Sequence, residues 1–193
     1  MNNRKTVSKI LIILVISAIL FGCKNGDQFA EASNLVSEIN KKIVETEELL
    51  TKTERRNKSL FGANIHTAEE LADYKKNKSV EAKSLIADHE KIYESLKEIS
   101  KLFDDISRMN LNPKYKEYAK LKSDEYAKRA EAVNVRKGNA QAFLEIDDQQ
   151  KMTARFDENT TKSNRIFNEA DEIGRNAQIL EAENRDVFAD LNQ

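Results

Sequence analysis

The sequence predicts an all-α protein: an elongated, antiparallel four-helix bundle with coiled-coil-like seams, following an N-terminal signal helix. Two compositional observations favour long helices, because charged residues make up 34% of the chain and only five Gly and one Pro interrupt it. The third observation is periodic, since apolar residues from residue 29 onward recur at alternating steps of four and three. Four such helices joined by short links are expected to run up-down-up-down.

Residues 1–22 have the layout of a secretory signal peptide. Three basic residues precede a largely apolar run of twelve, residues 10–21, and the small Gly22 closes it. A transmembrane helix needs about 20 apolar residues, so this run is too short to span a membrane. We therefore predict signal cleavage between Gly22 and Cys23.

The tetrapeptide Leu20-Phe21-Gly22-Cys23 resembles the lipobox of bacterial lipoproteins. The resemblance implies that Cys23 is lipidated on sulfur, carries a further acyl chain such as palmitate, and binds the protein to membrane lipid outside the cytoplasm. It also implies sorting to the outer membrane, facing the periplasm, if the host has two membranes, because Lys24 is not the aspartate associated with inner-membrane retention. The alternatives are a plain signal peptide with an incidental cysteine and an uncleaved anchor.

The remaining chain is predicted to form a tether at 23–28 and one helical domain at 29–193. Without the signal peptide, the chain has 29 Lys and Arg residues and 33 Asp and Glu residues, so the mature chain is mildly acidic. Mixed charges of this kind do not suit nucleic acid, which we exclude as a partner. Cys23 is the only cysteine, so stability has to come from packing and not from a disulfide.

The first helix is predicted over about 27–58, where the seam includes polar residues toward its far end. A turn follows, because Gly62 and Asn64 can adopt the positive φ that turns need. Thr67 and Glu70 then form the pattern of a capping box, in which each side chain accepts a hydrogen bond from the backbone of the other residue.

That capping box opens the second helix, predicted over 67–109. Its apolar seam is the strongest periodic signal in the chain and holds for five heptads. Lys75 and Lys78 lie on the seam, so we expect this end to be frayed or to extend past its neighbours.

The third helix is predicted over 113–145, because Asn112 is a competent N-cap and Pro113 is favoured in a first turn. Gly138 inside it should cost about 1 kcal/mol relative to Ala. The last helix is predicted over 147–191, after a tight turn capped by Asp147; one continuous helix of nearly 80 residues is the alternative.

The sequence shows no constellation typical of catalysis or metal binding. A di-iron bundle needs glutamates three residues before its histidines, but Ala63 and Ile86 stand at those positions relative to His66 and His89. Neither a Gly-x-Ser-x-Gly elbow nor a Gly-rich phosphate loop is present. We therefore expect no enzyme and no cofactor.

Three tyrosines, Tyr115, Tyr118 and Tyr126, occupy the first turns of the third helix, with basic residues between them. Aromatic faces bind sugars and proteins, so these residues are a candidate binding face. At helical spacing, however, such residues more often belong to the core, and the intervening acidic residues favour a solvated surface.

The layout of lipidated cysteine, short tether and four charged helices resembles the YkyA-type cell-wall-binding lipoproteins and the helical surface lipoproteins of spirochaetes. The resemblance implies association with the cell envelope. We expect a non-enzymatic, membrane-anchored lipoprotein that acts as an interaction or scaffolding module for an unknown envelope protein. The alternative is binding of a cell-wall polymer, peptidoglycan or an anionic glycan, through the tyrosines. A second copy could also complete the seams, which would mean self-association.

Overall fold

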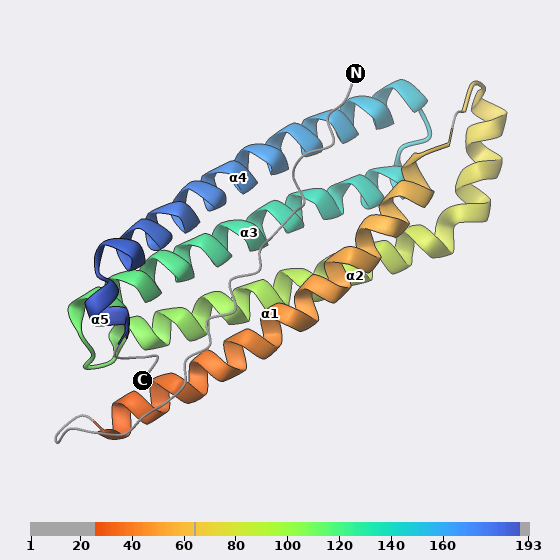
Figure 1. Cartoon of the computed structure of the whole chain (residues 1–193). Helices are drawn as coiled ribbons and strands as arrows, with labels where there is room; N and C mark the ends of the chain where they lie inside the picture. The colour runs from red at the N-terminus through yellow and green to blue at the C-terminus, as the bar shows by residue number, and fades with distance from the viewer. Residues whose placement is uncertain (1–25, 64, 190–193) are drawn as a thin grey trace.

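The computed structural model describes residues 26–63 and 65–189, and it confirms the all-helical, antiparallel bundle (Figure 1). The helices are α1 (Gly26–Phe61), α2 (Ala68–Arg108), α3 (Pro113–Glu145), α4 (Gln149–Glu183) and the short α5 (Arg185–Ala189). The predicted signal peptide 1–22, its cleavage site at Gly22 and the lipidation site Cys23 lie outside the described residues. Among the helices of the described part, none combines the length and apolarity needed to cross a membrane.

Two of the predicted helix starts are confirmed at atomic detail. The Thr67 hydroxyl accepts from the backbone N–H of Glu70 at 3.1 Å, and the Glu70 carboxylate accepts from the Thr67 N–H at 3.3 Å. At α3, the Asn112 side chain accepts from the Lys114 N–H at 2.9 Å, and Pro113 occupies the first turn.

The start of α4 differs from the prediction by one residue. Asp148 and not Asp147 caps the helix, with its carboxylate accepting from the Lys151 N–H at 2.9 Å. Asp147 is instead paired with the ammonium of Lys75 at 2.5 Å. Of the two neighbouring carboxylates, Asp148 therefore caps α4 and Asp147 forms a salt bridge to α2.

The last long helix also ends earlier than predicted, at Glu183 and not near residue 191. The Asn184 side chain donates to the carbonyl of Leu180 at 2.8 Å, and its backbone N–H donates to the carbonyl of Glu181 at 3.3 Å. Asparagine competes well for local backbone partners in this way, which interrupts the helix before α5.

Lys75 corrects the expectation of a frayed start to α2. Its side chain is only 11% exposed, and its ammonium donates to the Ile146 carbonyl at 3.2 Å. The aliphatic stem thus fills a seam position while the charge reaches the turn between α3 and α4. This end of α2 is packed, with Leu71 buried beside it.

The long helices pack in chain order, α1 on α2, α2 on α3 and α3 on α4. The main core cluster combines Ile39 of α1 with the α2 seam and with Tyr126 and Val133 of α3. Two polar seam residues of α1, Thr46 and Thr53, are buried because their hydroxyls donate to backbone carbonyls four residues earlier, at 2.6 and 2.7 Å.

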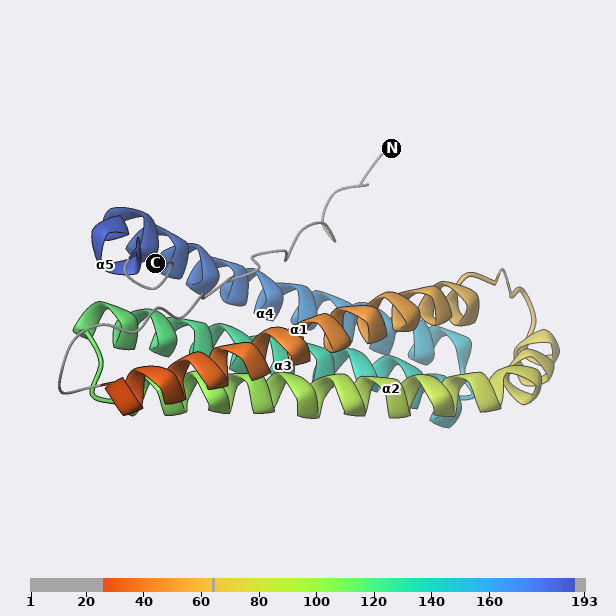
Figure 2. The ribbon, with the colours of Figure 1, turned by 60° about the horizontal axis from the view of Figure 1, so that its bottom comes forward.

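The bundle is closed at one end and open at the other. At the closed end, the Phe61 ring meets those of Phe156 and Phe143, with ring centres 4.8 and 6.1 Å apart. From there α1 and α4 diverge toward the end where α1 begins and α5 lies, as Figures 1 and 2 both show. A wedge is left between the first and the last long helix.

Candidate functional site

The wedge is a groove of about 1060 Å³, which we call the α1–α4 groove. It is lined by all four long helices and by Phe188 of α5. Its lining is illustrated by Val36, Ile43 and Leu50 of α1, Phe103 of α2, Tyr126 of α3 and Phe167 of α4. The volume is slightly above the range typical of ligand sites, about 300 to 1,000 Å³.

The floor of the groove is apolar and belongs to the main core. Leu96, Ile99 and Phe103 of α2 are at most 5% exposed and are shielded from water by the side chains above them. On the α1 side, Val36, Ile43 and Leu50 are only half-buried, which means that they pack on the core with one face and leave the other uncovered. The groove therefore offers apolar surface to a ligand without opening the core.

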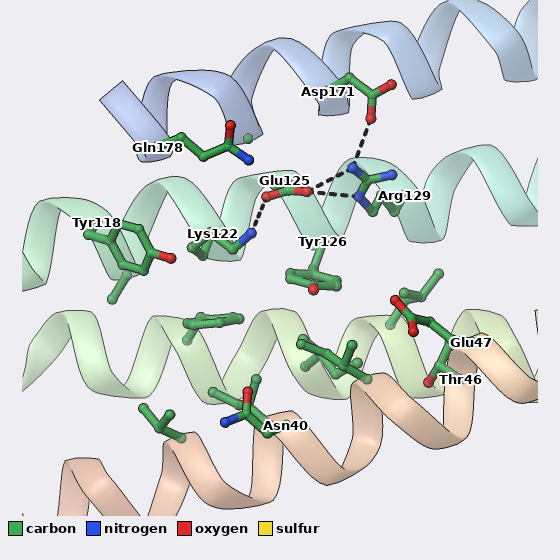
Figure 3. Close-up of a pocket in the computed structure, with 18 of the residues that line it drawn as sticks. Asn40, Thr46, Glu47, Tyr118, Lys122, Glu125, Tyr126, Arg129, Asp171 and Gln178 are labelled. Carbon is green, nitrogen blue, oxygen red and sulfur yellow. Dashed lines mark hydrogen bonds and ion pairs between the residues drawn. The ribbon is translucent and has the colours of Figure 1, made fainter. Parts of the chain in front are cut away.

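A charged network forms the middle of the α3 wall (Figure 3). The Glu125 side chain is 3% exposed, and its carboxylate accepts from Lys122 at 2.6 Å and from the Nε of Arg129 at 2.9 Å. Arg129 also reaches across to Asp171 of α4 at 2.8 Å. Burial opposes the charge of Arg129, but the carboxylates of Glu125 and Asp171 outweigh it and raise the pKa of the guanidinium.

Gly174 of α4 provides the space in which the Glu125 carboxylate lies. A Cβ at this position would come within 2.9 Å of the carboxyl carbon and of Oε2. Only a residue without a side chain can therefore stand opposite Glu125 while the network keeps its geometry. The buried network fixes how α3 and α4 pack beside the groove.

Four other charged residues that line the groove form no salt bridge with the described residues, and one of them is the exposed Arg175 of α4. On α1 these are Glu47 and Glu54, and burial raises the pKa of Glu47. On α3, Arg136 lies over the Phe167 ring at 4.7 Å and donates to Ser163 and Asn164 at 3.2 and 2.9 Å.

Burial lowers the pKa of Arg136, and the charge of Glu54 opposes that change from across the groove. Glu54 and Arg136 are nevertheless too far apart to form a salt bridge. Glu47 and Arg136 are thus partly desolvated, and no salt bridge offsets the free-energy cost of that desolvation.

The three candidate tyrosines all line the groove, and their burial increases from Tyr115 through Tyr118 to Tyr126. Tyr118 and Tyr126 are 8% and 4% exposed, and burial raises the pKa of both phenols. Tyr126 stacks on Phe103 at 5.7 Å, whereas Tyr118 and Tyr115 pack edge-on against Phe188. The tyrosines are therefore core residues with one side turned toward the groove.

The basic residues between the tyrosines do not form one face. Lys122 and Arg129 belong to the groove network, whereas Lys120 pairs with Asp124 at 2.9 Å and Lys128 with Glu169 at 2.9 Å, away from it. Sequence reasoning missed Glu125 as a site residue, although the i, i+3, i+7 spacing of Lys122, Glu125 and Arg129 places all three on one helical face.

His89 is a core residue in this structure. It is 4% exposed, and its Nδ1 donates to the Leu85 carbonyl at 2.9 Å, since a carbonyl can only accept. Burial lowers its pKa. Within residues 26–63 and 65–189, no group of three or more His, Cys, Asp or Glu side chains is placed to hold a metal ion.

Comparisons of the chain with protein-family models, with curated proteins and with solved structures give no match. Functional reasoning therefore depends on the chemistry of the groove. Its apolar floor and its uncovered α1 wall are suited to noncovalent binding, and the Glu125 network is already saturated by its own partners. The groove thus combines an uncovered apolar wall on α1 with a wall whose charges are paired within the protein.

Proposed function

We propose that the protein is a non-enzymatic lipoprotein, anchored through Cys23 to a membrane outside the cytoplasm, that acts as an interaction module in the bacterial cell envelope. In this proposal the α1–α4 groove binds a helical segment of another envelope protein. The observation that carries the proposal is the uncovered apolar wall of α1 above a closed core. Such a wall beside an open position in a bundle supports docking of a further helix.

The anchor would place the groove near the membrane surface. Each buried CH₂ contributes about 0.8 kcal/mol, and two acyl chains together hold a protein stably on a bilayer. If the anchor is a lipid on Cys23, Cys23→Ser releases the protein from membranes washed at alkaline pH. Retention of the Cys23→Ser protein in the washed membranes would refute the lipid anchor.

The docking site is tested by photo-crosslinking in cells at two adjacent positions of α1. Ile43 lines the groove, whereas its neighbour Val44 is 54% exposed and lies outside it. A photoreactive residue at position 43 should crosslink to a helical segment of an envelope protein that the same residue at position 44 does not capture. Equal capture at both positions would count against the groove.

A second candidate is binding of peptidoglycan or another anionic glycan. The observation that favours it is that Tyr115, Tyr118 and Tyr126 all line the groove, with Lys122 and Arg129 beside them. Salt-dependent co-sedimentation of the full chain with cell-wall sacculi, weakened by Tyr115→Ala, would support it. Absence of co-sedimentation at low salt would rule it out.

A further inference from the structure

The side of α1 that faces the groove carries a second heptad seam. Phe29, Val36, Ile43 and Leu50 are spaced by seven residues, all line the groove, and all are half-buried. The set that includes Ile39, Thr46 and Thr53 has the same spacing but is buried inside the bundle. A heptad set keeps one face of a helix toward a partner helix, and for the first set that partner position is open.

The exposed seam fixes the length and the shape of the occupant. From Phe29 to Leu50 the seam covers 22 residues, and at 1.5 Å per residue it spans about 32 Å. A helix of about six turns with one apolar stripe would cover it. A short peptide or a small molecule would leave most of the seam uncovered.

The opposite wall is polar, which sets how this helix is turned. Apart from Phe167 and Gly174, the α4 residues that line the groove are polar or charged: Asn164, Asn168, Asp171, Arg175 and Gln178. An amphipathic helix therefore meets α1 with its apolar stripe and α4 with its polar flank. A helix that is apolar on all sides would desolvate the α4 amides without hydrogen bonds.

The charged residues that line the groove indicate which charges the partner helix carries. Glu47 on the α1 side and Arg136 on the α3 side both face the groove, are half-buried and have no ion pair in the described residues. Arg136 lies opposite Glu54, which is one heptad beyond Glu47 and hence about 10 Å further along α1. Glu47 and Arg136 are thus offset by about two helical turns and lie on different walls of the groove, and Glu54, on the same wall as Glu47, faces Arg136.

We infer that the partner is an amphipathic helix with a basic residue on one flank of its apolar stripe and an acidic residue on the other flank, about seven residues away. The basic residue pairs with Glu47, and the acidic residue pairs with Arg136. The inference rests on the proposed docking function of the groove and adds the chemistry of its partner.

Two synthetic helical peptides of about 22 residues test the inference against the full chain. Both carry the same apolar stripe. The first has one lysine and one glutamate on opposite flanks, seven residues apart, and the second has glutamine at both positions. Fluorescence anisotropy with labelled peptide at low concentration measures the two affinities. The first peptide should bind at least about tenfold more tightly.

Substitutions in α1 assign that preference to Glu47. Glu47→Gln should reduce the advantage of the charged peptide, because the lysine of the peptide loses its partner while the glutamate keeps Arg136. Glu48→Gln is the matched control, because Glu48 is the adjacent, exposed glutamate and does not line the groove. Far-UV circular dichroism checks that both variants keep their helices.

The remaining outcomes separate this inference from the proposed function. Equal affinity for the two peptides would overturn the charge pattern and leave helix docking intact. Binding of neither peptide would overturn both the inference and the docking role of the groove, whereas the lipid anchor is judged by Cys23→Ser. A dimer of the full chain in light scattering that excludes both peptides would make a second copy the occupant and overturn the inference.

Discussion

Two glycines in the interiors of long helices should respond in opposite ways to the same substitution. Alanine is favoured over glycine in a helix by about 1 kcal/mol, so propensity alone predicts a gain at both Gly138 and Gly174. The surroundings differ. A Cβ at Gly138 would meet the end of the Asn159 side chain at 2.9 Å, and that half-buried amide can rotate away. Gly138→Ala should therefore stabilise the protein by up to about 1 kcal/mol.

At Gly174 the Cβ would meet a carboxylate that cannot move freely. Glu125 is held by Lys122 and Arg129, and all three side chains are at most 12% exposed. Displacing the carboxylate breaks at least one charge-assisted hydrogen bond, worth about 1.5 to 3 kcal/mol. After subtraction of the gain in propensity, Gly174→Ala should destabilise the protein by about 1 to 2 kcal/mol.

Urea unfolding followed by far-UV circular dichroism measures both variants, with a change in midpoint at constant slope taken as a change in stability. The variant Glu125→Ala provides the decisive background, because it removes the group that the new methyl would strike. In that background Gly174→Ala should become neutral or stabilising. If Gly174→Ala stabilises the wild-type protein as much as Gly138→Ala does, the fixed position of Glu125 is wrong.

Two further predictions concern α2. Burial and the positive charges of Arg136 and Lys137 lower the pKa of His89 below its ordinary value of 6.5, against a smaller opposing effect of Asp88 and the hydrogen bond to Leu85. Near that pH the unfolded chain then binds more protons than the folded chain, so the melting temperature should fall as the pH drops below about 6.5. His89→Gln should reduce this dependence of the melting temperature on pH. His66→Gln, at an exposed site, is the control and should not reduce it. Lys75→Met should lower the unfolding free energy by about 1 kcal/mol in urea unfolding, because the Ile146 carbonyl loses its donor, whereas Lys76→Met at an exposed position should leave it unchanged.

The seam of α2 could be predicted from the sequence because α2 has one dominant packing pattern. The periodic positions from Ala82 to Ile106 are all buried, and the departures are the two lysines that precede them, Lys78 and the more deeply buried Lys75. At Lys75 the rule that charged residues avoid the core failed, because lysine can bury its stem and still place its ammonium on a distant carbonyl. The carbonyl belongs to the turn after α3, so the pairing is a tertiary contact that no local pattern encodes.

The charged wall of the groove was harder to predict for a related reason. Helix α3 lies between α2 and α4, so it is buried on two sides and its apolar stripe is diffuse. A buried Glu125 becomes acceptable only when two cations and the space above Gly174 are supplied together. Lys122 and Arg129 are near in sequence, but Gly174 and Asp171 come from another helix, and their register is set by the folded bundle.

The four seams found in the sequence indicated a bundle but not whether it would close around one core. The walls of the groove give the physical reason that it does not. Moving α1 onto α4 would take Glu47 fully out of water, although none of the described residues forms a salt bridge with it. Burial of unpaired ions costs several kcal/mol each, more than a few additional apolar contacts recover. The carboxylate of Glu47, which opposes closure of α1 onto α4, is therefore a group that a basic residue of a partner helix would neutralise.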